Sequence, residues 1–125
     1  MKPPSKARAV FAALRALVSG RLTRYEIADH SMEPTLRNGD WVLGERRVRR
    51  LSPGDVVVVT HPNRSDFEMV KRVAAVSPGG VDVRGDSPDH SEDSRTFGPV
   101  PIESVRARLL LVYRPRPIRP LGPGA

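Results

Sequence analysis

The chain has 125 residues, 38% of them hydrophobic, and 21 Lys and Arg against 14 Asp and Glu give it a formal net charge of +7. That size suits one compact core and falls short of what two domains need, and because cysteine is absent, a disulfide scaffold, a thiolate metal site and a cysteine nucleophile are excluded. The positive charge would suit binding to nucleic acid, anionic lipid or an acidic partner. Stacking on nucleic-acid bases requires aromatic residues interleaved with a basic run, and the few aromatic residues are not arranged in this way. We therefore expect a solvated basic surface and no nucleic-acid partner.

Residues 1–21 are predicted to be a basic amphipathic segment. The stretch 9–18, AVFAALRALV, contains Arg15 and is too short to cross a bilayer, which takes about 20 apolar residues. Its large apolar residues share one helical face, and they are Val10, Phe11, Leu14, Leu17 and Val18. Such a helix can pack on its own domain, lie peripherally on a membrane or dock on a partner, and a cleaved signal peptide is a further alternative.

Residues 22–113 read as short strands separated by Gly and Pro turns. The predicted strands lie at 22–28, 40–43, 55–60, 67–76, 81–84 and 105–113. The β-branched run Val56–Val59 is typical of a strand covered on both faces, and it is the expected centre of the core. The polar segment 85–98 is long for a plain connection, which favours a functional role.

The pattern predicts a mainly antiparallel β fold with one short N-terminal helix. A single folded domain is expected at 22–113. Proline alternates with arginine after Arg114, so residues 114–125 are predicted to be a disordered tail that stays out of the sheet.

Ser31 is the first candidate for chemistry, because it follows a predicted strand and Pro34 interrupts regular structure beyond it. A serine hydroxyl is a weak nucleophile until a base takes its proton. Histidine is the usual base, but His30 adjoins Ser31 and would point away from it in extended chain, while His61 and His90 lie in polar turn segments where solvated side chains are expected. No His pair has metal-ligand spacing, so we expect no metal.

Lys71 is the alternative base, since a desolvated amine can have its pKa lowered by about 3 to 5 units. It is the only lysine inside the predicted sheet and shares a strand face with Met69 and Val73. A lysine on an edge strand that reaches solvent is the competing interpretation. The alternation of side chains along the strand leaves both interpretations of Lys71 open, because Arg72 on the other face also has apolar neighbours.

Three segments resemble the sequence boxes of bacterial signal peptidase I and its relatives. Ser31–Leu36, followed by Gly39-Asp40, is similar to the family's nucleophile box. Lys71–Val73 is similar to its general-base box. Gly85–Arg95, followed by Gly98–Val100, is similar to its third box, which supports the lysine. All three occur in the family's order.

The resemblance covers residues 26–112 and implies the β fold shared with self-cleaving repressors and a Ser/Lys dyad that needs no cofactor. It implies that Ser31 attacks a peptide carbonyl and that Lys71 accepts its proton. By the same resemblance, Ser91 orients the Lys71 amine, and Asp93 and Arg95 form a supporting ion pair.

The resemblance also places the backbone N–H of Ser31 in an oxyanion hole. Two residues earlier the family commonly has Ser or Gly, and here it is Asp29, whose carboxylate would oppose the developing negative charge. A second departure concerns size. Signal peptidases carry membrane-spanning segments before the nucleophile and often a large extra β domain, and we expect neither in this sequence.

A minimal chain with an SMEPTL box is most similar to the proteases that mature nickel-type superoxide dismutase by removing an N-terminal propeptide. We therefore expect a serine endopeptidase acting on a protein with a cleavable N-terminal segment, in the cytoplasm or peripherally at a membrane. Two alternatives remain, an atypical signal peptidase acting on secreted preproteins and a non-enzymatic basic module that binds nucleic acid or a membrane surface. A self-cleaving regulator would need a DNA-binding domain and a cleavable linker before Ser31.

Overall fold

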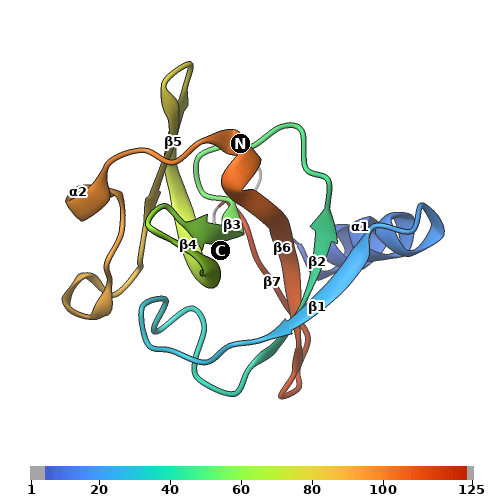
Figure 1. The fold of residues 1–125 in the computed structure, drawn as a ribbon. Helices are drawn as coiled ribbons and strands as arrows, with labels where there is room; N and C mark the ends of the chain where they lie inside the picture. Colours follow the sequence, from blue (N-terminus) through green and yellow to red (C-terminus); the bar gives the residue numbers. More distant parts are fainter. Residues whose placement is uncertain (1–4, 124–125) are drawn as a thin grey trace.

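The computed structural model describes residues 5–123, which form one antiparallel sheet with a helix at the N-terminus (Figure 1). The strands are β1 (Leu22–Glu26), β2 (Trp41–Arg46), β3 (Val56–His61), β4 (Arg64–Ser77), β5 (Gly80–Arg84), β6 (Val105–Arg114) and β7 (Arg119–Pro120). The helices are α1 (Lys6–Val18), the short α2 (Ser94–Phe97) and the 3-10 turns η1 (Pro88–His90) and η2 (Ile102–Ser104). The predicted mainly antiparallel β fold with an N-terminal helix is confirmed.

The strand order is β1-β2-β6-β3-β4-β5, and every pairing is antiparallel. Strand β3 lies inside the sheet, and its residues Val56–Val59 are at most 1% exposed, as expected of the centre of the core. Side chains of a strand alternate between faces, so Val56 and Val58 join one apolar cluster while Val57 and Val59 join another. The sheet is therefore covered on both faces.

The segment between β1 and β2 is fastened to the first of these clusters. Met32 and Leu36 are 1% and 0% exposed, and both pack in the cluster that contains Val56 and Val58. Large apolar side chains that are fully buried on either side of a loop fix its path. Ser31, which precedes Met32, therefore sits on a rigid segment.

Helix α1 packs through small residues rather than through the predicted apolar face. Ser5 caps its N-terminus by accepting a hydrogen bond from the Arg8 N–H. The buried residues of α1 are Ala9, Ala13 and Ala16, and Ala9 and Ala13 pack with Leu110 and Leu111 of β6. Within residues 5–123, no helix has the length and apolar character that crossing a bilayer requires.

The C-terminal segment differs from its prediction over the part that the structure describes. Arg119 and Pro120 pair with Val112 and Leu111 as β7, and Leu121 is buried in the core. A two-residue edge strand accommodates Pro120 because the N–H that continues the pairing comes from Leu121, which donates to the Leu110 carbonyl. The predictions for residues 1–4 and 124–125 lie outside the described residues.

Candidate active site

Ser31 lies in the loop after β1, with its side chain turned into the protein and only 2% exposed. Its Oγ is 3.2 Å from Asp29 Oδ1 and 3.4 Å from the carbonyl oxygen of Val70 in β4. Both oxygens are acceptors for the hydroxyl proton. The contact with Val70 brings the candidate nucleophile to the strand that carries Lys71.

Lys71 follows Val70 in β4 and is 3% exposed. It shares the buried face of the strand with Met69 and Val73, while Arg72 turns to the opposite side. The ambiguity left by the sequence is thereby resolved in favour of a buried lysine. Its Nζ donates a hydrogen bond of 3.1 Å to Ser91 Oγ.

Burial lowers the pKa of Lys71 below its ordinary value, because the charged ammonium loses its hydration. The negative charges of Asp29, Asp93 and Glu92 act in the opposite direction, and Arg95 adds to the lowering. The effect of burial is the largest of these contributions. Burial thus makes the amine easier to deprotonate, and the uncharged amine is the form that can accept a proton.

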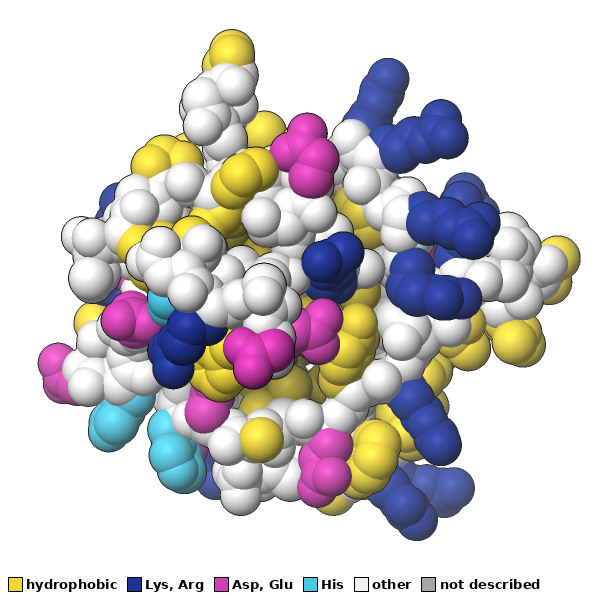
Figure 2. Space-filling model, in the orientation of Figure 1, with side chains coloured by type: hydrophobic (Ala, Val, Ile, Leu, Met, Phe, Trp, Pro, Cys, Tyr) yellow, Lys and Arg dark blue, Asp and Glu magenta, His cyan; other side chains and the backbone are white. Residues whose placement is uncertain are grey.

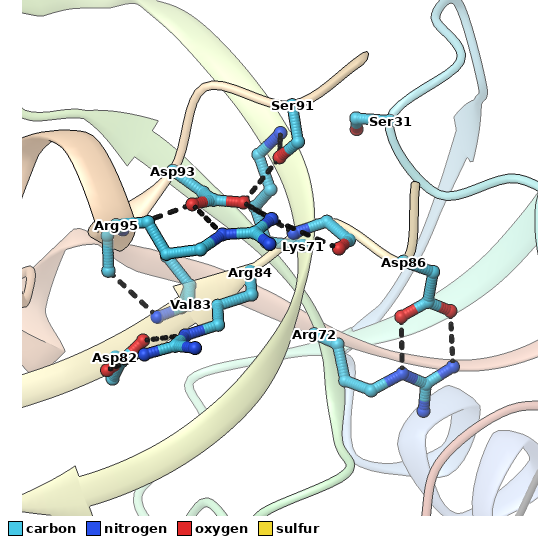
Figure 3. Close-up of polar contacts among 12 residues, drawn as sticks. Ser31, Lys71, Arg72, Asp82, Val83, Arg84, Asp86, Ser91, Asp93 and Arg95 are labelled. Atoms are coloured by element: carbon cyan, nitrogen blue, oxygen red, sulfur yellow. Dashed lines mark hydrogen bonds and ion pairs between the residues drawn. The ribbon is translucent and has the colours of Figure 1, made fainter. Parts of the chain in front are cut away.

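The segment 85–98 carries the residues that hold the Lys71 amine (Figure 3). Ser91 Oγ donates to Asp93 Oδ2 at 2.6 Å, and the same carboxylate accepts from Arg95 Nη2 at 2.6 Å and from the Gly85 N–H at 2.8 Å. Burial alone would raise the pKa of Asp93, but these hydrogen bonds outweigh it and hold that pKa well below its ordinary value. Ser91 is thus fixed as an acceptor toward Lys71.

Gly85 lets the two loops of the site touch. A Cβ on Gly85 would lie 2.4 Å from Ser91 Oγ and 2.6 Å from the Ser31 carbonyl oxygen, closer than real Cβ contacts allow. Next to it, the Ser87 N–H donates to the same Ser31 carbonyl at 2.9 Å. The nucleophile loop and the loop that holds the lysine are therefore fixed against each other.

Two parts of the expected arrangement are not assembled. Among the described residues, the only hydrogen-bond acceptor of Lys71 Nζ is Ser91 Oγ, and no hydrogen bond joins Nζ to Ser31 Oγ. The Ser31 N–H, expected to bind an oxyanion, instead donates to Asp29 Oδ1 at 3.2 Å. Asp29 thus holds both the N–H and the hydroxyl of Ser31.

A second link between the loops, formed by Arg72 and Asp86, was not predicted from the sequence. Arg72 Nε and Nη2 each donate to Asp86 at 2.9 Å, and Asp86 also accepts from Thr35 Oγ1 at 2.6 Å. This bidentate pair ties the strand of Lys71 to the loop of Ser31. Strand alternation could have predicted part of this link, because a buried Lys71 places Arg72 on the opposite face of β4.

The expectation that His61 is solvated is wrong. His61 is 6% exposed, its Nε2 lies 2.7 Å from Glu92 Oε1, and its Nδ1 accepts from the Asn63 N–H. Both ring nitrogens are therefore occupied. His30 pairs with Glu33, and none of the hydrogen bonds of residues 5–123 joins a histidine to Ser31 Oγ. Across the same part of the chain, no group of three or more His, Cys, Asp or Glu is arranged to hold a metal ion.

A buried serine near a buried amine whose pKa is lowered suits the transfer of one proton and the attack on an acyl group. Residues 6–87, which include Ser31 and Lys71, match the model of the family described as signal peptidase, peptidase S26. The chain belongs to the S26 signal peptidase family. The matched stretch ends before Ser91, so the loop that holds the lysine amine lies beyond it.

Relatives within the S26 family include proteins of mitochondria and bacteria. The chain is 33% identical over 116 residues to the mitochondrial inner membrane protease subunit 1 of Xenopus tropicalis, covering 74% of this chain and 68% of that protein. It is 34% identical over 119 residues to the mitochondrial ATP-independent inner membrane protease subunit 1b of Arabidopsis thaliana, covering 74% and 69%. It is 41% identical over 54 residues to signal peptidase I of Aquifex aeolicus, covering 41% and 21%. A peptidase of this family acts on a protein substrate.

Proposed function

We propose that this S26 family member is a serine endopeptidase in which Ser31 is the nucleophile and Lys71 the general base. The observation that carries the proposal is the burial of the Lys71 amine on β4, next to the residue whose carbonyl contacts Ser31 Oγ. A solvated lysine would stay charged and could not serve as a base.

In the proposed reaction, Ser31 Oγ bonds to the carbonyl carbon of the scissile peptide while its proton passes to Lys71 Nζ. The tetrahedral intermediate then breaks the carbon–nitrogen bond, and Lys71 delivers the proton to the leaving amine. Water attacks the resulting ester with Lys71 as base, and the proton returns to Ser31 Oγ as the ester bond breaks. A small rotation of the serine hydroxyl away from Asp29 precedes the first step.

Ser91, Asp93 and Arg95 are positioning residues in this proposal. An uncharged amine that donates one N–H to Ser91 Oγ keeps its lone pair free for the Ser31 proton. The Arg95 guanidinium offsets the charge of Asp93, which limits how far that carboxylate raises the pKa of Lys71.

An extended substrate segment fits beside this pair. Strand β4 pairs with β5 only from Arg72 to Ser77, so the edge before Arg72 lacks a strand partner on that side within the described chain. A largely apolar pocket of about 240 Å³ lies next to it, lined among others by Ile27, Ala28, Val58 and Val70. Main-chain pairing on a free edge with one side chain in a pocket is a recurring way to bind peptides.

The substrate we propose first is the precursor of a nickel-type superoxide dismutase, from which an N-terminal propeptide would be removed. The support for it is the SMEPTL form of the nucleophile box in Ser31–Leu36. The match to signal peptidase I of Aquifex aeolicus favours a second candidate, removal of the leader of a secreted preprotein.

The test is to incubate the purified chain with each precursor separately and to determine the new N-termini by intact-mass spectrometry. Cleavage at one site near the N-terminus is expected, and both Ser31→Ala and Lys71→Met are expected to abolish it. Ser52→Ala and Lys6→Met are the matched controls, because both residues are exposed and lie outside β4 and outside the two loops of the site.

Cleavage of one precursor and not the other identifies the substrate. If the Ser31→Ala protein cleaved a precursor at the normal rate, the nucleophile assignment would be wrong. If neither precursor were cleaved while the protein bound nucleic acid or vesicles regardless of Ser31, the non-enzymatic alternative would replace the proposal.

A further inference from the structure

Four of the five large apolar side chains of α1 are exposed, whereas Val10 packs on the domain. Phe11, Leu14, Leu17 and Val18 are 63%, 54%, 59% and 88% exposed, whereas the alanines on the other side of the helix are buried against β6. We call these four side chains the apolar ridge. Contiguous exposed apolar surface on a water-soluble domain usually marks a place where something binds.

Arginines flank the apolar ridge on one side. Arg8 and Arg15 line the hollow beside Phe11, and Arg15 also lines a second hollow whose other arginines are Arg21, Arg47, Arg49, Arg50 and Arg108. Figure 2 shows Lys and Arg side chains gathered on the right of the view, where Figure 1 places α1 and β2. We call the arginines of the second hollow the arginine cluster.

The arginine cluster carries a large surplus of positive charge. Glu45 is the acidic residue that lines this hollow, and it is already paired with Arg21 and Arg108. Arg15, Arg49 and Arg50 are exposed, and their side chains form no ion pair with another described residue. Their charge is therefore free to bind anions outside the chain.

We infer that α1 is an in-plane anchor, in which the apolar ridge enters the surface of an anionic bilayer while the arginine cluster contacts lipid headgroups. An amphipathic helix with large apolar residues on one face and basic residues beside them binds membranes in this way, and each basic residue near an anionic surface adds attraction. The helix has 13 residues, about 20 Å at the usual rise, so it lies in the interface and does not cross a core of about 30 Å.

A lipid surface fits these observations better than a partner protein. The side chains of the ridge are exposed, and α1 lies at the periphery of the fold (Figure 1). Arg15, Arg49 and Arg50 are exposed and are not paired with an acidic group of the described residues. A fluid anionic surface can contact exposed cations beside an apolar ridge without requiring a partner of complementary shape. This inference does not depend on the proposed protease activity.

The anchor also sets the direction of the candidate active site. Figure 1 shows the loop after β1 and the segment that contains α2 on the side of the sheet away from α1. A chain bound to a membrane through α1 would hold Ser31 toward water. The anchored protein is therefore arranged to meet a substrate that approaches from the aqueous phase.

The test is flotation of the full chain with vesicles of phosphatidylcholine alone and of phosphatidylcholine mixed with phosphatidylglycerol. We expect binding to the mixed vesicles, weakening as salt is added. The double variant Phe11→Ser/Leu14→Ser should bind the mixed vesicles at least about tenfold more weakly, because it removes the buried apolar area. Arg49→Gln/Arg50→Gln should lose the preference for anionic vesicles.

The matched controls are Val76→Ser, an exposed apolar residue of β4, and Arg84→Gln, an exposed arginine of β5. Both should bind as the unchanged chain does, and thermal melts should show all variants folded. Equal binding to both vesicle types, or unchanged binding by the Phe11→Ser/Leu14→Ser variant, would overturn the inference. So would sedimentation showing a dimer that this variant converts to monomer without any vesicle binding, because the ridge would then join two copies of the chain.

Discussion

The carboxylate of Asp29 contacts Ser31 twice, accepting from its N–H at 3.2 Å and lying 3.2 Å from its Oγ. These are the two groups that acyl transfer would use, the first as an oxyanion donor and the second as the nucleophile. Asp29 also raises the pKa of Lys71 against the effect of burial. All three effects restrain the proposed reaction.

Asp29→Ser should therefore speed cleavage. The substitution frees the Ser31 N–H for the oxyanion, removes a charge that opposes it, and lets the pKa of Lys71 fall further. We expect kcat/KM to rise by about tenfold or more and the midpoint of the pH–rate profile to move to lower pH. Asp89→Ser, which removes an exposed carboxylate in the 85–98 segment, should change neither. A slower Asp29→Ser enzyme would mean that Asp29 assists the reaction.

The buried Lys71 should make the free energy of unfolding depend on pH in the alkaline range. Because burial lowers its pKa in the folded state, the unfolded chain binds more protons between that lowered pKa and the ordinary 10.5, so stability rises with pH across this interval. Lys71→Met should remove the rise and leave a protein at least as stable near neutral pH. Urea unfolding at several pH values measures this, with Lys6→Met as control. An unchanged slope in Lys71→Met would count against a buried amine.

Gly85→Ala should disrupt the contact between the two loops. The new methyl group has no room between Ser91 Oγ and the Ser31 carbonyl, and overpacking of this kind costs about 1 to 3 kcal/mol. We expect a large loss of cleavage rate in a protein that still folds, because the substitution would move Ser31 and Lys71 apart. Gly79→Ala is the control, since a Cβ there meets only an ordinary contact at 3.7 Å. A fully active Gly85→Ala enzyme would contradict the loop geometry.

Asp86→Asn should weaken the link between Arg72 and Thr35 by about 1.5 to 3 kcal/mol, the usual contribution of hydrogen bonds to a charged group. Burial alone would raise the pKa of Asp86, but the hydrogen bonds from Arg72 and Thr35 outweigh it and lower that pKa. The stabilisation is thus fully present above the ordinary 3.8 and is lost as pH falls through the lowered pKa. Acid unfolding should show this loss in the unchanged chain and in Asp66→Asn, but not in Asp86→Asn.

The sequence predicted most of the sheet because its strands alternate or are β-branched and its turns carry Gly and Pro. Val56–Val59 could be placed at the centre on that ground alone. The packing of α1 could not, because amphipathicity shows that a helix has two faces but not which one the domain covers, and the close approach to β6 selected alanines.

The sequence predicts which residue types make up the candidate site, but it does not predict how their side chains are oriented. Lys71 and Arg72 are equally plausible inward residues of a strand, and only the pairing of β4 with β3 and β5 decides between them. The contact of Asp29 with the Ser31 N–H depends on the turn of the loop, which spacing does not specify. His61 was misplaced because its neighbours are turn formers, although its side chain reaches back to Glu92.

The most direct test of the account is a carbon-13 NMR titration of the lysine Cε groups, which is practical because Lys2, Lys6 and Lys71 are the only lysines of the chain. The signal that is lost in Lys71→Met is the signal of Lys71. We predict that Lys71 loses its proton at a pH clearly below 10.5, its ordinary pKa. Titration of Lys71 at or above 10.5 would show a charged amine at neutral pH and contradict the assignment of Lys71 as the base.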